Sequence, residues 1–248
     1  MTDLFREYSK YYDLIYGDKD TLAEVEYIAE LLSRYGVSGG RLLEFGSGTG
    51  RHARLLSARG YDVHGIEQSA QMLQMCKPMD GCTFEEGDIA FVSTGKTYDA
   101  VLSLFHVMSY QRTNARLNQV FSNAARHLNS NGLFVFDVWF SPAVLSLKPS
   151  VRVKKLTSDD LEVIRIAEPF LRINDNTVDV NYTIFVRPCG EAAYSSFSET
   201  HVMRHFSIPE LELFAESNGF SLLSAEEWVT KQAPSVETWG VCMVCKKQ

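Results

Sequence analysis

The first part of the chain alternates short apolar runs with amphipathic stretches. Residues 22–35, 52–59, 70–75 and 114–128 carry apolar side chains at helical spacing. Residues 41–45, 61–67, 82–85, 98–105 and 133–139 are short apolar runs typical of strands. Apolar strands separated by helices are typical of a parallel sheet that is covered on both faces. The pattern therefore predicts an α/β fold.

The alternation of strands and helices stops after Pro142. Four strand-like stretches follow without intervening helices, at residues 151–156, 161–166, 178–186 and 195–204. Turn signals at residues 174–176 and 188–190 separate some of them, which predicts an inserted antiparallel sheet. Helix then returns at Ser207, a candidate N-cap with Glu210 three residues later, as in a capping box. Residues 221–229 and 239–246 close the chain as two strands.

These elements predict a seven-stranded, mostly parallel sheet whose last strand runs antiparallel, plus an inserted antiparallel β lid. We assign residues 1–144 and 206–248 to the core with an N-terminal cap, and residues 145–205 to the lid. A chain of 248 residues is long enough for one core domain that carries such an insertion.

Charge and cysteine content narrow the function classes. The chain has 24 Lys and Arg against 31 Asp and Glu, a formal charge of −7, which argues against a nucleic-acid partner. The first 13 residues are too polar for a signal peptide, and no apolar run is long enough for a membrane span. Five cysteines do not suggest a disulfide framework, and strand alternation places Cys242 and Cys245 on opposite faces. We therefore expect a cytoplasmic protein.

A glycine loop at residues 42–51 is the most informative motif. Its sequence, Leu-Leu-Glu-Phe-Gly-Ser-Gly-Thr-Gly-Arg, joins a strand to a helix through three glycines at alternate positions. Such a loop lets a ligand approach the backbone closely. Dinucleotide sites need G-x-G-x-x-G, whereas here the third glycine comes one residue early. Glu44 before the loop would repel a pyrophosphate but would suit a ligand with an ammonium or sulfonium charge.

This loop, with an acid before its first glycine, resembles motif I of the class I S-adenosylmethionine-dependent methyltransferases. Glu67 ends the second strand 21 residues after Gly46, Asp88 follows the third strand, and residues 98–106 match the fourth strand of that family. The resemblance covers about residues 40–140 plus the closing helix and strands. It implies a Rossmann-like fold, an enzyme, S-adenosylmethionine as cofactor and S-adenosylhomocysteine as product.

The resemblance also implies a role for individual residues. Glu67 would accept hydrogen bonds from two ribose hydroxyls, and Asp88 would accept one from the adenine amino group. Met72 would pack near the adenine, and Leu104 would offer its carbonyl beside the methionine part of the cofactor. The other cofactor contacts that it implies are Tyr12, Tyr16, Glu44, Gly46, Ser47, Gly48, Gly50, Gln68, Ile89 and Phe105.

The aromatic N-terminal stretch adds a narrower resemblance. Residues 11–20, Tyr-Tyr-Asp-Leu-Ile-Tyr-Gly-Asp-Lys-Asp, look like the N-terminal cap of bacterial small-molecule methyltransferases. That group includes the N,N-dimethyltransferases of nucleotide-linked amino sugars. In them the cap folds over the cofactor and helps to bind the acceptor, while an insertion serves as lid and often as a dimer surface. We therefore expect a small-molecule acceptor, narrowly favour an amino sugar, and consider a homodimer.

Three residues are candidates for the transfer step. Methyl transfer is a direct displacement, so the enzyme must mainly align the acceptor and exclude water. His106, after the fourth strand, is a candidate base or acceptor contact, or else shapes its loop. Asp137, at the end of the fifth strand, would hold an amine or accept a proton, or else forms a cap or ion pair. His201 is a candidate acceptor contact. For the basic tract at residues 152–155 we favour a solvated strand face over a phosphate site.

The sequence leaves three alternatives to an N-methyltransferase of a small acceptor. A hydroxyl acceptor would need a general base, for which His106 or Asp137 would serve. A macromolecular acceptor is less favoured, because the chain has neither an Asn-Pro-Pro-Tyr element nor an evident basic face. A non-catalytic binder would not need Glu67 and Asp88 beside an intact glycine loop. We expect no metal, because His201 and His205 have no third ligand nearby in the sequence.

Overall fold

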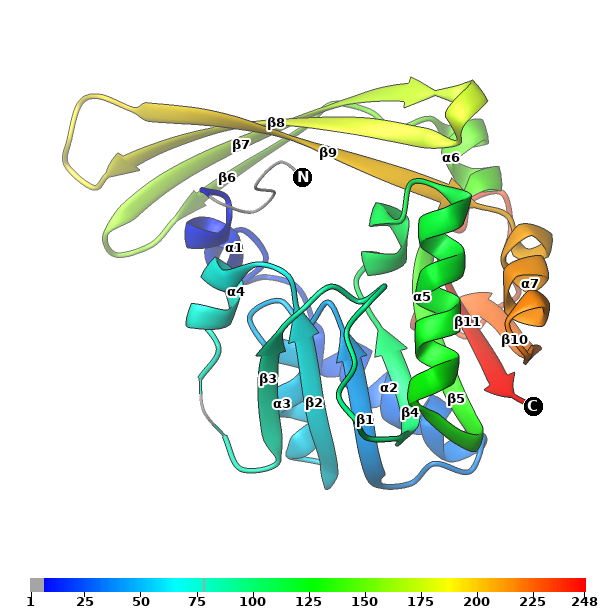
Figure 1. Cartoon of the computed structure of the whole chain (residues 1–248). Coiled ribbons are helices and arrows are strands. Elements are labelled where there is room, and N and C mark those ends of the chain that lie inside the picture. The colour runs from blue at the N-terminus through cyan, green and yellow to red at the C-terminus, as the bar shows by residue number, and fades with distance from the viewer. Residues whose placement is uncertain (1–6, 78) are drawn as a thin grey trace.

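The computed structural model describes residues 7–77 and 79–248. Five parallel strands form the centre of the sheet in the order β3-β2-β1-β4-β5. Their bounds are β1 (Gly40–Phe45), β2 (Tyr61–Glu67), β3 (Cys82–Glu86), β4 (Tyr98–Ser103) and β5 (Leu128–Phe140). Their carboxyl ends all point to one edge of the sheet, which faces the lid (Figure 1).

Two antiparallel pairings complete the core sheet. β11 (Gly240–Lys247) pairs antiparallel with β5, and β10 (Phe220–Glu227) pairs antiparallel with β11. The seven-stranded sheet with an antiparallel last strand is therefore confirmed. One boundary differs: β5 begins at Leu128, and Asn131-Gly132 lies inside it rather than in a preceding turn. The register of β4 and β5 shifts there, and Asn131 has φ 64°, so the turn signal marks a bulge.

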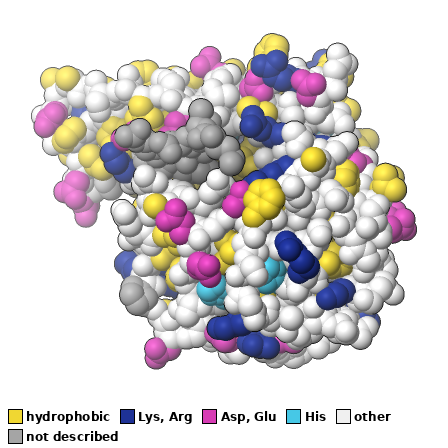
Figure 2. Space-filling view, viewed as in Figure 1, with side chains coloured by type: hydrophobic (Ala, Val, Ile, Leu, Met, Phe, Trp, Pro, Cys, Tyr) yellow, Lys and Arg dark blue, Asp and Glu magenta, His cyan; other side chains and the backbone are white. Residues whose placement is uncertain are grey.

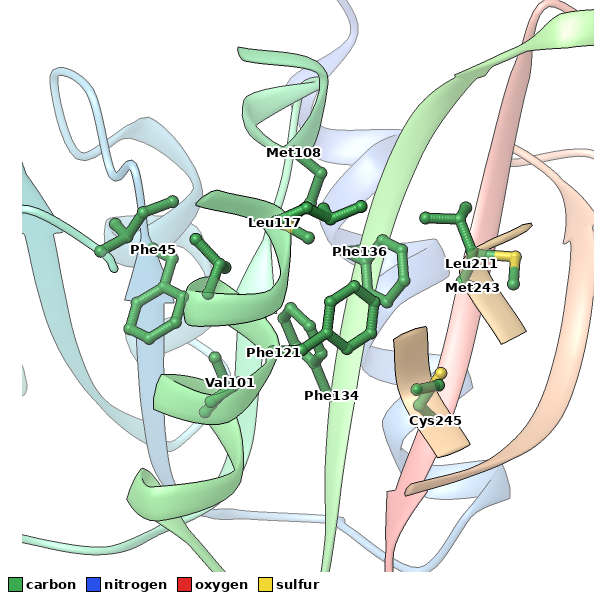
Figure 3. Close-up of a cluster of buried hydrophobic side chains, with 14 of the residues drawn as sticks. Phe45, Val101, Met108, Leu117, Phe121, Phe134, Phe136, Leu211, Met243 and Cys245 are labelled. Atoms are coloured by element: carbon green, nitrogen blue, oxygen red, sulfur yellow. The ribbon is translucent and has the colours of Figure 1, made fainter. Parts of the chain in front are cut away.

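Helices cover both faces of this sheet. α2 (Thr21–Arg34) and α3 (Arg51–Ser57) pack on one face, while α5 (Asn114–His127) and α7 (Ile208–Ser217) pack on the other. In α5, Phe121 meets Phe134 and Phe136 edge to face, at 5.4 and 5.5 Å between ring centroids (Figure 3). The short α4 (Ala70–Gln74) follows β2. These apolar layers fix where each strand ends, and hence where the loops after them lie.

The lid consists of four antiparallel strands in the order β9-β8-β7-β6. They are β6 (Arg152–Thr157), β7 (Leu161–Arg172), β8 (Thr177–Pro188) and β9 (Ser195–Phe206). The helix α6 (Ser141–Leu147), which the pattern did not predict, leads into them with Pro142 in its first turn. β9 also pairs with the end of β5 over two residues, so the lid continues from the core sheet and arches over the strand ends (Figure 1).

The N-terminal helix α1 (Ser9–Ile15) lies between the lid and the core (Figure 1). Tyr8 and Ile15 are buried with Val163 and Ile184 of the lid. This packing brings the aromatic N-terminal segment over the carboxyl ends of the strands, where the resemblance places a cap.

Three further features of the molecule concern the hydrophobicity of its helices, its cysteines and its surface charge. No helix in the described ranges is long and apolar enough to cross a membrane. The five cysteines are free thiols, with Cys242 and Cys245 buried on opposite faces of β11 as predicted. Positive and negative side chains are interspersed over the face in Figure 2.

Candidate active site

The glycine loop between β1 and α3 adopts a left-handed backbone at all three of its glycines. Gly46, Gly48 and Gly50 have φ of 73°, 56° and 73°. A Cβ on Gly46 would lie 2.6 Å from the side chain of Val107, and one on Gly50 would lie 2.6 Å from Phe84. Gly48 differs, because a Cβ there would meet nothing within 4 Å. Two glycines therefore allow close packing, and the third presents bare backbone to open space, where a ligand fits.

Glu67, at the end of β2, holds its carboxylate beside this bare backbone. One oxygen accepts the N–H of Gly48 at 2.9 Å, and the other accepts the N–H of Ser69 at 2.8 Å. Each carboxylate oxygen has two acceptor sites, so acceptor capacity remains on both. Burial raises the pKa of Glu67 above its usual value. A fixed carboxylate next to an open glycine backbone suits a ribose with two hydroxyls.

Other predicted cofactor residues surround this point. Met72 in α4 is buried, and Ser69 caps that helix by accepting the N–H of Met72 at 3.3 Å. Ser47 has a buried hydroxyl oxygen that finds no partner among the described residues. Ile89 is buried after β3, whereas Gln68 is exposed at the end of β2. The residues present therefore fit an adenosyl group, and the individual contacts stay predictions.

Asp88 has a strong partner that the sequence did not reveal. Arg116 of α5 donates two hydrogen bonds to its carboxylate, at 2.7 and 2.5 Å, and the N–H of Ala90 donates a third at 2.9 Å. This bidentate pair fixes the carboxylate and balances its charge. A hydrogen bond from adenine to Asp88 stays a prediction, and it would use the acceptor capacity that Arg116 leaves.

Glu44 lies in β1, just before the glycine loop. Its side chain is only 2% exposed, and its carboxylate lies 3.8 Å from Nδ1 of His52 on α3. Burial, with the neighbouring Glu67 carboxylate, raises the pKa of Glu44 to about 8. The raised pKa favours the protonated form of Glu44, and its contact with the cofactor stays a prediction.

His106 and Asp137 meet where β4 and β5 end. Nδ1 of His106 lies 2.6 Å from a carboxylate oxygen of Asp137, a contact with the length of an ion pair but not the alignment of a linear hydrogen bond. The backbone N–H of His106 also donates to both carboxylate oxygens at 3.1 Å. Asp137 is 1% exposed, while the side chain of His106 is 23% exposed. The side chain of His106 is therefore accessible whereas that of Asp137 is buried, and their roles in the transfer step stay predictions.

The turn that carries His106 is strained. Phe105 and His106 both have φ 62°, a left-handed conformation that costs energy for residues with a side chain. Packing holds Phe105 in place, because Nζ of Lys19 lies 3.4 Å from its ring centroid and Tyr16 contacts its ring edge to face at 5.1 Å. The preceding Leu104 is buried. Tertiary contacts therefore fix the direction of His106.

A polar network that the sequence did not predict anchors the segment between the cap and α2. Glu24 accepts hydrogen bonds from His52 at 3.0 Å and from the Trp228 ring N–H at 3.0 Å, and it pairs with Lys19 at 2.7 Å. Burial alone would raise the pKa of Glu24, but the hydrogen bond from His52 and the charge of Lys19 lower it to about 2. This network holds Lys19 over Phe105.

The cap is bonded to the glycine loop. Thr49 donates to Asp13 at 3.0 Å, and Arg51 donates to the carbonyl of Tyr16 at 2.9 Å. Burial raises the pKa of Tyr12 well above 10, and Tyr16 and Glu67 add to the rise. The cofactor contact of Tyr12 stays a prediction. The hydroxyl of Tyr16 faces the lid, where it contacts Arg165 at 3.4 Å, and its contact with the cofactor stays a prediction.

His201 lies on the inner face of the lid and is 2% exposed. Its Nδ1 lies 2.8 Å from the hydroxyl of Tyr110, and its Nε2 lies 3.3 Å from Glu199. With both ring nitrogens engaged, His201 belongs to the wall of the site, and a direct contact with the acceptor stays a prediction. His205 contacts Ser141 instead, at 2.7 Å, so the two histidines do not act as a pair.

One side chain of the basic tract in β6 is partly buried, and the other two are exposed. Arg152 and Lys155 are exposed, as the favoured interpretation required. Lys154 instead points toward α1, where it donates to the carbonyl of Ile15 and pairs with Asp18, both at 2.6 Å. The ammonium group of Lys154 therefore links the lid to the cap.

Comparisons with known proteins agree with this geometry. Residues 42–132 match the family described as a methyltransferase domain. The chain is 27% identical over 209 residues to a dTDP-3-amino-3,4,6-trideoxy-alpha-D-glucopyranose N,N-dimethyltransferase of Streptomyces venezuelae, covering 83% of this chain and 86% of the relative. It is 28% identical over 205 residues to YqeM of Bacillus subtilis, which is named only as a methyltransferase, covering 80% and 81%.

The fold is shared with solved structures. The crystal structure of DesVI from Streptomyces venezuelae superposes with a TM-score of 0.82, covering 97% of this chain and 98% of that one at 23% identity. Residues 42–132 are therefore a methyltransferase domain, and the chain is an enzyme. The domain match and the shared fold support S-adenosylmethionine as the methyl donor.

Proposed function

We propose that this methyltransferase transfers a methyl group from S-adenosylmethionine to the nitrogen of a small polar acceptor, with a nucleotide-linked amino sugar as the favoured acceptor. The observation that carries the proposal is that the cap links the glycine loop to the lid. Through Thr49 and Asp13 the cap is bonded to the glycine loop, and through Ile15 and Lys154 it is bonded to the lid. A site covered by a cap and a lid would suit a small molecule better than a macromolecule.

The chain offers a binding surface for the cofactor along the ends of β1, β2 and β4. The backbone of Gly48 would border the nucleoside, Glu67 would accept the ribose hydroxyls, and Met72 would pack beside the base. When bound, the cofactor supplies an electrophilic methyl group on a positively charged sulfur. The protein's task is then to orient the acceptor and to exclude water.

His106 is the proposed proton acceptor. An amine reaches a neutral active site largely as its ammonium form, which has no lone pair for attack, so a proton must leave it before or during transfer. His106 would take this proton at Nε2, while the buried Asp137 stabilises the resulting imidazolium through Nδ1. The lid and the cap would limit access of water to the reacting atoms.

The amino-sugar acceptor is supported by relatives rather than by this chain's own geometry. The Streptomyces venezuelae relative, which is aligned over most of both chains, is named for an amino-sugar substrate. A second candidate, an O-methyltransferase, is favoured by the 2.6 Å contact of His106 with Asp137, because a hydroxyl acceptor needs such a base. The homodimer and the cytoplasmic location also remain proposals, the latter supported by the five free cysteines.

The test incubates the protein and S-adenosylmethionine with matched acceptors. The panel contains dTDP-linked amino sugars, the same sugars with a hydroxyl in place of the amino group, and the amino sugars without the nucleotide. Mass spectrometry should detect methylated products of the dTDP-linked amino sugars first. Methylation of the hydroxyl analogues alone would identify an O-methyltransferase. No methylated product from any member, with S-adenosylhomocysteine bound normally, would contradict the proposed acceptor class.

A further inference from the structure

The inner face of the lid changes from apolar to polar above the site. In the strand register, Lys154 of β6 lies opposite Arg165 of β7, and Tyr182 of β8 lies opposite Glu199 of β9. One end of this face is apolar, around Val163, and buries the start of the cap. The lid therefore presents a short polar stripe to the cap tyrosines rather than a uniformly apolar surface.

Arg165 is the unusual member of this stripe. Its Nη1 donates to the hydroxyls of Tyr8 at 3.3 Å and Tyr16 at 3.4 Å, both long for hydrogen bonds. Its guanidinium carbon lies 5.8 Å from the ring centroid of Tyr16 and 5.4 Å from that of Tyr182. Nε is buried and has no hydrogen-bond partner, and among the described residues no carboxylate lies within 4.0 Å of this guanidinium.

Three other arginines of the lid each pair with an acid. Arg187 pairs with Glu162, Arg204 pairs with Glu210, and Arg172 pairs with Asp179, each at 2.5 Å. A half-buried guanidinium without an acidic partner has an uncompensated desolvation cost, which phenol hydroxyls and aromatic faces offset only in part. An anionic ligand would complete its surroundings, because a guanidinium presents paired N–H groups that match phosphate or carboxylate oxygens.

Arg165 is close to the proposed reaction centre. The ring of Tyr16, which Arg165 contacts, packs against Phe105 at 5.1 Å, and Phe105 precedes His106. Two aromatic rings therefore separate the guanidinium from the proposed base. Lys154 on the neighbouring strand is paired with Asp18, which balances its charge, so it does not compete for the same ligand.

We propose that Arg165 is an acceptor-specificity residue that binds the anionic oxygens of a phosphate or diphosphate group. In this arrangement the anion lies at the cap–lid junction, and the group to be methylated points toward His106. The inference rests on the proposed function and extends it, because it requires an acceptor with an anionic group. A carboxylate is also an anion that a guanidinium can bind, so the test compares ligands with a phosphate against a ligand with a carboxylate.

Calorimetry on the protein preloaded with S-adenosylhomocysteine tests this inference without turnover. The ligands are dTDP, inorganic pyrophosphate and glucuronate, titrated into the wild type, Arg165→Gln and Arg165→Lys. We expect dTDP to bind the wild type and to bind Arg165→Gln about tenfold or more weakly, since a charge-assisted contact is lost. Arg165→Lys keeps the charge and should bind dTDP more tightly than Arg165→Gln. Glucuronate binding in place of dTDP and pyrophosphate would assign the site to a carboxylate and overturn the phosphate assignment.

Lys155→Gln is the matched control. It removes one positive charge from the same strand pair but on the exposed face, and it should change dTDP affinity by less than about twofold. The inference is wrong if Arg165→Gln binds dTDP as the wild type does, if Arg165→Lys binds no better than Arg165→Gln, or if the wild type binds none of the anions. Binding of S-adenosylhomocysteine to each variant separates these results from failure of the proposed function. If the wild type does not bind S-adenosylhomocysteine, the proposed function itself fails.

Discussion

The carboxylate of Asp137 contacts His106 at two points, its ring Nδ1 at 2.6 Å and its backbone N–H at 3.1 Å. The first contact orients the imidazole, and the second stabilises a left-handed backbone that His106 would not adopt readily by itself. One buried side chain thus sets both the direction of the ring and the shape of the turn that carries it.

We expect His106→Ala to lower kcat more than it changes KM. Loss of a general base typically costs about 100-fold or more in rate, whereas the cofactor site does not include this side chain. Steady-state kinetics with an acceptor that the wild type methylates checks this expectation. A variant that changes KM alone would show that His106 only contacts the acceptor.

Asp137→Asn should give a smaller loss than His106→Ala, because an amide oxygen still accepts from the backbone N–H of His106. It no longer stabilises an imidazolium, so kcat should fall while the affinity for S-adenosylhomocysteine stays within about twofold. Kinetics and calorimetry on one preparation provide both values. Equal loss of cofactor affinity and activity would instead indicate that Asp137 supports the whole turn.

Glu67→Ala should weaken S-adenosylhomocysteine binding by about 1.5–3 kcal/mol, because hydrogen bonds to a charged acceptor are lost. Calorimetry measures the dissociation constant. Glu86→Ala is the control, since Glu86 is an exposed acid paired in register with Glu67 on the neighbouring strand. An unchanged dissociation constant for Glu67→Ala would refute the proposed ribose contact.

Gly48→Ala should separate backbone strain from loss of ligand space. Its left-handed φ of 56° costs an alanine about 1–2 kcal/mol of stability, and the new methyl group would point into the space left open for the nucleoside. Gly60→Ala is the matched control, with φ 90° and no atom within 4 Å of the added Cβ. Thermal unfolding should show a loss of stability in both variants, and only Gly48→Ala should lose affinity for S-adenosylhomocysteine. Similar affinities in both variants would rule out a ligand at Gly48.

Glu44→Gln should change how stability depends on pH. The folded protein holds a proton on Glu44 up to a pKa of about 8, whereas an unfolded glutamate releases it near 4.5. The native state therefore binds more protons between these values, and the contribution of Glu44 to stability falls as pH rises through this window. The stability of Glu44→Gln relative to the wild type should thus increase from pH 5 to 8 by about 3 kcal/mol, and thermal unfolding at each pH measures it. A difference between Glu44→Gln and the wild type that stays constant with pH would contradict the buried, protonated carboxyl.

The core fold follows from local pattern because its signals are local. Apolar strands, helix periodicity and the Ser207 cap depend on neighbours within a few residues, and Ser207 does accept the N–H of Glu210. Where a sequence signal was compatible with two local structures, only the three-dimensional structure distinguished them. Asn131-Gly132 became a bulge within β5, because pairing with β4 continues on both sides of it.

The sequence by itself determined that a glycine loop and the acid Glu67 would meet at one sheet edge, because parallel strands bring their carboxyl ends together. Only the tertiary structure decided which groups keep their charge and which have partners. Arg116 is 28 residues from Asp88, and Arg165 meets Tyr8 across 157 residues. The spacing of residues along the chain does not predict such contacts. The packing of lid, cap and helices sets which of these groups are buried, and burial decides the protonation of Glu44 and the missing counter-charge at Arg165.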